Sequence, residues 1–139
     1  MSAYRLAAAQ ASVVPTISSA AANRYAETVR RQINEVFEEE RVPWAAYGMF
    51  SNFHIFTNPG RSAIVPTHFD PLDQPAEVLF DKSQANLVHK FRLATMTGGV
   101  DFSGSPGGVI SATHGEAELE HTIKAVRNSV RMLKQEGEV

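Results

Sequence analysis

The chain contains no cysteine, and this absence removes several kinds of chemistry at once. Without thiols the protein forms no disulfide, has no thiolate nucleophile and cannot bind a metal through sulfur. No stretch approaches the run of about 18 apolar residues that a membrane-spanning helix needs. Neither sign of charge dominates, because the formal net charge is −2 and no basic stripe is present. We therefore expect neither a nucleic acid nor a membrane as partner.

What the sequence does contain is typical of one globular domain. Its 139 residues are enough to enclose a single hydrophobic core, and 43% of them are hydrophobic and 20% charged. Residues Met1–Val14 are rich in alanine but include Arg5 and Gln10, so they lack the continuous apolar stretch of a signal peptide. We expect a cytoplasmic protein, with an N-terminal segment over residues 1–18 that can form a helix and a domain over residues 19–139.

The first long helix is predicted to begin at Ser18 or Ser19, either of which can cap it. A shorter helix over Tyr4–Val14 is expected to end before Pro15, because the residue before a proline disfavours the helical conformation. Spacings of three and four residues give the long helix one apolar face. That face consists of Ala22, Ala26, Val29, Ile33, Val36 and Phe37.

Two further helices are expected later in the chain. Gln84–Thr97 has the apolar spacing of a helix and is followed by two glycines, which stop it. The last helix is predicted to begin at about Gly115, because Thr113 and Glu116 have capping-box spacing. Acidic residues crowd its first turns and basic residues its end, as the helix dipole prefers.

The remaining regular segments predict strands. Residues 44–50 and 53–57 are rich in aromatic and β-branched residues and read as a hairpin, in which Gly48 marks a bulge or a close backbone approach. Residues 109–112 predict a third strand, and residues 61–82 an ordered loop. The order helix, strand, strand, helix, strand, helix favours an α+β fold: a small, mainly antiparallel three-stranded sheet with helices packed on one face.

The histidines do not indicate a metal site or a catalytic set. Their spacing lacks the short repeat of a zinc-protease helix, and His54, inside a strand, favours a hydrogen-bonded structural role. The other histidines are His68, His89, His114 and His121. We name no metal ligand and, from the residues alone, no catalytic residue, since no serine elbow is present and no two acidic residues are forced onto one face.

The glycine-rich segment over residues 103–108 differs from a phosphate-binding loop. A P-loop needs a following lysine and a helix, whereas here no lysine follows and the next element reads as a strand. A turn with unusual backbone angles is one interpretation. The other is a backbone that lines a pocket supplied partly by other parts of a larger protein.

Two sets of short motifs resemble the small domain of class III aminotransferases, in particular members similar to glutamate-1-semialdehyde aminomutase. The first set resembles the hairpin of that domain and consists of Val42-Pro43-Trp44, Tyr47-Gly48 and the run from Phe53 to Pro59. The second resembles its last helix-loop-strand-helix unit and consists of Leu93-Ala94, Gly98-Gly99-Val100-Asp101, Pro106-Gly107-Gly108 and Ser111-Ala112-Thr113-His114. The resemblance covers most of the chain from about Asn23 onward.

The resemblance implies a pyridoxal-phosphate enzyme of fold type I in which a large cofactor-binding domain precedes this one. Its Schiff-base lysine, its pyridine-binding aspartate and its phosphate-binding turn would then lie before Met1. None of the lysines here (Lys82, Lys90, Lys124 and Lys134) matches the cofactor lysine in context. We therefore expect no cofactor, no cofactor-binding residue and no catalysis in the isolated chain, although pyridoxal phosphate serves the parent family.

The same resemblance implies the partner and the site. The large domain of a parent aminotransferase is the expected partner, and the loop of Phe102, Ser103, Gly104, Ser105, Pro106 and Gly107 would form the edge of its substrate pocket. The aminomutases have a phenylalanine-glutamate-alanine segment where this chain has Ser105-Pro106-Gly107. An amino-acid or β-amino-acid transaminase is therefore an equally good parent.

Two other functions are compatible with the sequence. A stand-alone ligand-binding or oligomerising module could keep the small-domain fold, forming a dimer or larger assembly through the face that a large domain would cover. An independent small enzyme could use His54 or His68 together with Asp70.

Overall fold

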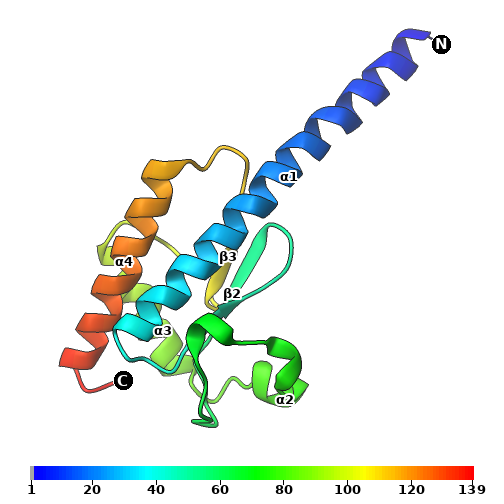
Figure 1. Ribbon diagram of the computed structural model, residues 1–139. Coiled ribbons are helices and arrows are strands. Elements are labelled where there is room, and N and C mark those ends of the chain that lie inside the picture. Colours follow the sequence, from blue (N-terminus) through cyan, green and yellow to red (C-terminus); the bar gives the residue numbers. More distant parts are fainter. Residues whose placement is uncertain (1) are drawn as a thin grey trace.

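The computed structural model describes the backbone of residues 2–139 and the side chains of residues 19–139. Figure 1 shows a small sheet beside the longer helices, with the N-terminal part of α1 extending beyond the rest of the chain. The elements are α1 (Ser2–Glu39), β1 (Ala45–Tyr47), β2 (Asn52–Phe56), η1 (Pro66–His68), η2 (Pro71–Asp73), α2 (Ala76–Leu79), α3 (Ala85–Thr97), β3 (Gly107–Val109) and α4 (Glu116–Gln135). The predicted α+β fold and element order are confirmed, with η1, η2 and α2 as short turns inside the predicted loop.

The prediction of two separate helices before residue 40 is wrong, because α1 is continuous from Ser2 to Glu39 and passes through Pro15. Proline removes one backbone donor and disturbs the preceding turn. Alanines at positions 7–9 and 20–22 flank this site, and alanine has the highest helix propensity of all residues. Ser18 and Ser19 therefore lie within the helix, and the domain boundary proposed between residues 18 and 19 stays a prediction.

The sheet has the order β1-β2-β3, and both pairs are antiparallel. Ala46 lies opposite Ile55, and Phe53 lies on the same face, where all three join the hydrophobic core with residues of α1, α3 and α4. The six residues of the predicted apolar face of α1 are all buried. The opposite face of the sheet is partly covered too, since Phe56 is buried there and stacks on Phe69 of the loop at 5.2 Å between ring centroids.

Aromatic rings connect the elements of the core. Trp44 meets Phe37 of α1 at 5.8 Å and Phe91 of α3 at 5.5 Å, both edge to face. The ring centroid of Phe102 lies 5.8 Å from that of Phe91 and 5.5 Å from that of Phe53 in β2, so Phe102 links α3 to the sheet. Such pairs prefer these spacings and orientations and stabilise the fold beyond the apolar area they bury.

The predicted third strand is displaced by two residues, since β3 spans Gly107–Val109 instead of residues 109–112. Gly107 lies opposite His54, and a Cβ atom at Gly107 would stand 2.2 Å from the Phe53 carbonyl oxygen. Only glycine permits this approach, so the pairing begins inside the glycine-rich segment. At Gly48 the sequence predicted a bulge or a close backbone approach, and the structure has the close approach: a Cβ atom there would stand 2.7 Å from the Asn52 carbonyl oxygen.

The cap of α4 also differs from the predicted Thr113–Glu116 pair. The Glu118 carboxylate accepts the Gly115 backbone N–H at 2.8 Å, and this bond is the main cause that lowers the pKa of Glu118. The Thr113 hydroxyl lies 2.6 Å from the Ser111 hydroxyl instead. Residues 111–114 form a turn before the helix. The capping carboxylate is therefore that of Glu118, two positions after the predicted Glu116.

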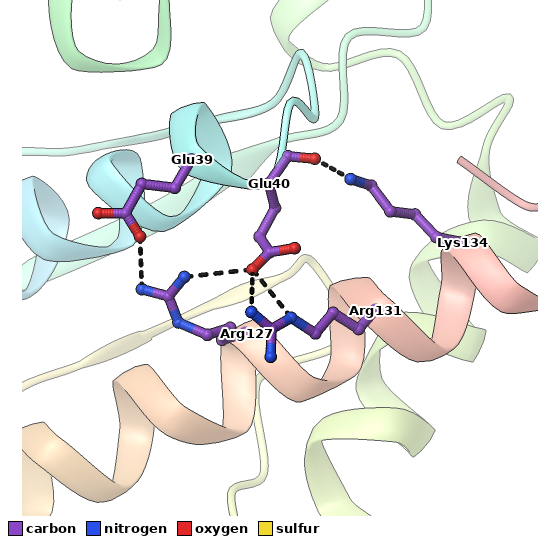
Figure 2. A network of polar contacts seen from close by, with 5 residues as sticks. All are labelled: Glu39, Glu40, Arg127, Arg131 and Lys134. Atoms are coloured by element: carbon purple, nitrogen blue, oxygen red, sulfur yellow. Dashed lines mark hydrogen bonds and ion pairs between the residues drawn. The ribbon is translucent and has the colours of Figure 1, made fainter.

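The end of α1 is attached to α4 by a network of charges around Glu40 (Figure 2). One Glu40 carboxylate oxygen lies 3.2 Å from Arg127 and 2.8 Å from Arg131, and Lys134 donates to the Glu40 carbonyl oxygen. Arg127 also pairs with Glu39 at 2.7 Å. The Arg131 hydrogen bond is the main cause that lowers the pKa of Glu40. Only 13% of the Glu40 side chain is exposed, whereas Glu39 is 60% exposed.

Within the part of the chain whose side chains are described, no helix is both long and apolar enough to cross a membrane.

Replacing Glu40 by glutamine should lower the free energy of unfolding by about 1 kcal/mol at neutral pH, because both arginines lose a charged acceptor. Folding lowers the pKa of Glu40, so its contribution is present above the unfolded pKa and is lost as the pH falls through the folded value. Urea unfolding from neutral to acid pH should show wild type and Glu40→Gln converging. Glu39→Gln, with its exposed side chain, is the control and should stay within about 0.5 kcal/mol of wild type. Equal losses for both variants would contradict the central role of Glu40.

Replacing Gly107 by alanine should weaken the β2–β3 pair, because its Cβ would overlap the Phe53 carbonyl oxygen. We expect a loss of about 2–3 kcal/mol, measured by thermal or urea unfolding. Gly104→Ala is the matched control, since a Cβ there meets nothing within 4 Å. A neutral Gly107→Ala variant would show that β3 is not held by this close approach.

Candidate functional site

The structure divides the loop that the sequence marked as a pocket edge. Phe102 lies in the core and Gly107 is buried in β3, whereas Ser103 is exposed. Gly104, Ser105 and Pro106 line a cavity together with residues of the sheet face opposite the hydrophobic core, with residues 78–82 and with Ala85 and Val88 at the start of α3. Whether these residues border a substrate stays a prediction.

Backbone hydrogen bonds hold this loop in place. The Ser103 N–H donates to the Gly107 carbonyl at 2.9 Å, which closes the turn. The Ser103 hydroxyl donates to the Ser105 carbonyl at 2.5 Å. The Ile55 N–H of β2 donates to the Pro106 carbonyl at 2.7 Å. The loop is thus an ordered turn attached to the central strand, and its position follows from that of the sheet.

The cavity has a volume of about 460 Å³, which is within the range of small-molecule sites. Residues of β1 and β2 form its floor, the 78–85 segment forms one side, and Gly104–Pro106 form another. Tyr47 and His54 are cross-strand partners on the floor, with ring centroids 5.5 Å apart. Burial raises the pKa of Tyr47 above its ordinary value, at which the hydroxyl is already neutral at physiological pH.

Sequence reasoning did not identify Tyr47, Lys82 and Gln84 as cavity residues. Tyr47 and His54 share a face by strand alternation, and that signal was available. The sequence contains no such signal for the path of residues 78–85 across this face, because that path depends on a loop whose sequence has no periodicity. The Gln84 amide oxygen accepts the Thr57 hydroxyl at 2.7 Å, which ties the start of α3 to the end of β2.

His54 was expected to have a hydrogen-bonded structural role. Among residues 19–139 its side chain makes no hydrogen bond: it is exposed on the sheet and contacts the Tyr47 ring, so that expectation is wrong. His68 and Asp70 are engaged locally: His68 lies 3.1 Å from the Thr67 hydroxyl, and Asp70 accepts the Leu72 N–H at 2.9 Å. Over residues 19–139, no ion pair joins a histidine to Asp70, and no group of three histidine or acidic side chains could hold a metal ion.

The lysines do not fit the cofactor that the resemblance implies. The amine of a lysine that forms a Schiff base is activated by desolvation or by a neighbouring cation, either of which lowers its pKa. Lys82 borders the cavity but is exposed, and Lys124 is exposed on α4. Lys90 pairs with Glu138, and Lys134 caps the end of α1. Asp81, the acidic residue beside Lys82, accepts the Ser83 N–H at 2.7 Å and is therefore committed to its own turn.

Comparison with known proteins gives a structural likeness alone. No protein-family model and no curated protein matches the sequence. An omega-transaminase from Sphaerobacter thermophilus has a similar structure, with a TM-score of 0.62 and 22% sequence identity over 84% of this chain. The matched region is 25% of the transaminase chain, so this chain spans about a quarter of that protein's length. The chain therefore has the fold of one part of a transaminase.

Proposed function

We propose that this chain is the C-terminal small domain of a class III pyridoxal-phosphate aminotransferase and that it does not catalyse transamination on its own. The shared fold with a quarter of an omega-transaminase is the observation that supports the proposal most strongly. The ordered motifs from the Trp44 hairpin to the Thr113 turn support it independently. Fold alone does not define activity, so the motifs are needed to specify the class.

In the intact enzyme this domain would pack against a large cofactor-binding domain and place the loop over residues 102–107, through its accessible Gly104, Ser105 and Pro106, at the edge of the substrate pocket. The attachment of that loop to β2 supports this role, because a pocket edge must be held in a fixed position. Ser105-Pro106-Gly107 replaces the glutamate-containing segment of the aminomutases, so we propose the class and leave the subfamily open. We propose the cytoplasm as its location.

A self-associating module is the second candidate function, and exposed apolar residues at the hairpin favour it. Met49, Phe50 and Val109 are 66%, 68% and 76% exposed. They lie near one another, because Asn52 bonds to the Met49 carbonyl and pairs with Val109. Either a large domain or a second copy would cover such residues. Sedimentation of the purified chain separates the two, because a strictly monomeric species would contradict the module.

The isolated chain should not form a stoichiometric adduct with pyridoxal phosphate. After incubation with the cofactor and reduction with borohydride, peptide mass spectrometry should find only sparse labelling spread over exposed lysines, because no lysine is desolvated. Lys82, which borders the cavity, is the residue to examine, and Lys82→Arg is its control variant. The proposal would be overturned if one lysine were labelled stoichiometrically and if replacing that lysine by arginine abolished the label.

A further inference from the structure

The two edges of the sheet differ in whether their backbone groups have partners. In an antiparallel sheet, alternate residues of an edge strand direct both the N–H and the C=O away from the neighbouring strand. At the β1 edge this residue is Ala46. The Asn34 amide of α1 donates to the Ala46 carbonyl at 2.9 Å and accepts the Ala46 N–H at 2.6 Å. One side-chain amide thus takes the place of a neighbouring strand and closes this edge.

The β3 edge is open at Val109. The Ile110 N–H donates to the Ser51 carbonyl at 2.7 Å, and the Ile55 N–H donates to the Pro106 carbonyl at 2.7 Å. Since even-numbered residues of this segment face β2, the backbone groups of Val109 point outward. Within residues 19–139, neither its N–H nor its C=O has a hydrogen-bond partner. Val109 is also 76% exposed, so this edge is a place where a further strand can be added.

The open part of the edge is short, which favours a partner strand that crosses it at one point. On one side of Val109 the Gly107 carbonyl accepts the Ser103 N–H at 2.9 Å. On the other side the Ser111 N–H donates to Nδ1 of His114 at 3.0 Å. A long added strand would compete with both bonds. A second copy crossing at Val109 needs only the two unpaired groups, because each Val109 N–H donates to the C=O of the other.

The charge of this surface also favours a second copy. Residues 42–60 and 102–115, which form the hairpin and the β3 segment, contain no aspartate, glutamate, lysine or arginine. Charges close to the axis of a two-fold dimer face their like, and this surface has none to repel its copy. A partner selected by charge would find no counter-charge on these segments.

We propose that the β3 strands of two copies pair antiparallel across a two-fold axis at Val109, so that the two sheets become one continuous sheet. The two Val109 side chains then lie opposite each other on one face and cover each other. This pairing rests on the self-association of the second candidate function and specifies its contact. It is independent of the aminotransferase assignment, which the cofactor-trapping experiment tests.

The dimer affinities of Val109→Lys, of Val109→Glu and of their equimolar mixture test the pairing, measured by sedimentation of the full 139-residue chain. Like charges directly opposite each other destabilise a cross-strand pair. Each variant alone should therefore dimerise at least about tenfold more weakly than wild type, and the mixture about tenfold more tightly than either variant. Thermal unfolding should be unchanged, because the Val109 side chain is exposed.

Leu72 provides the matched control, because it is 90% exposed on η2, outside the edge. Leu72→Lys and Leu72→Glu should dimerise as wild type does, alone and mixed. Hydrogen exchange of the Val109 amide gives a second measurement: this amide should become protected as the protein concentration rises, since only the second copy supplies its acceptor.

Three results would overturn the pairing, and they separate it from the functions proposed above. A dimer that the Val109 variants leave intact would show self-association through another surface. Weakened dimers without recovery in the mixture would show that Val109 does not face its own copy. A wild-type chain that stays monomeric would overturn both the pairing and the self-associating module, and would leave the aminotransferase assignment standing.

Discussion

The contact between Trp44 and its aromatic neighbours is the interaction on which the rest of the structure depends. Trp44 follows the break at Pro43 and touches the ring of Phe37 on α1 and the ring of Phe91 on α3. Phe102 continues the contacts to β2 and stands directly before the loop that borders the cavity. The core thus determines where that loop lies. A cavity residue such as Ser105 is positioned by packing at Phe102, although Phe102 itself does not reach the cavity.

The chemistry of the chain agrees with a supporting role. Its basic residues mostly stabilise the fold: Arg127 and Arg131 join α4 to Glu40, Lys134 caps α1, and Lys90 pairs with Glu138. An amine becomes a nucleophile near physiological pH when desolvation or a neighbouring cation lowers its pKa, whereas an ion pair with a carboxylate raises it. Under the proposed function, the domain supplies a positioned surface and a fixed loop, and the reactive amine comes from the large domain.

Much of the fold could be predicted from the sequence, because buried positions on α1 and the hairpin follow simple periods. The failures are local and have identifiable causes. Alanine-rich segments on both sides of Pro15 allow α1 to continue through it. Because Gly107 has no Cβ, it can approach β2 closely, and β3 begins there. The turn at residues 111–114 precedes α4, so Glu118 rather than Glu116 caps the helix. The cavity could be predicted only in part, since strand alternation pairs Tyr47 with His54 but gives no position for Lys82. The path of a loop without sequence periodicity is determined by tertiary contacts, such as the stacking of Phe69 on Phe56.

We propose that this chain is one domain of a larger aminotransferase, since its fold matches a quarter of an omega-transaminase chain. The genomic DNA immediately upstream of the Met1 codon tests that claim most directly. We predict coding sequence for a large domain that carries the cofactor lysine, either in frame with this one or separated from it by a recent interruption. A translation start at Met1 with no aminotransferase coding sequence before it would contradict this assignment and favour a self-associating module.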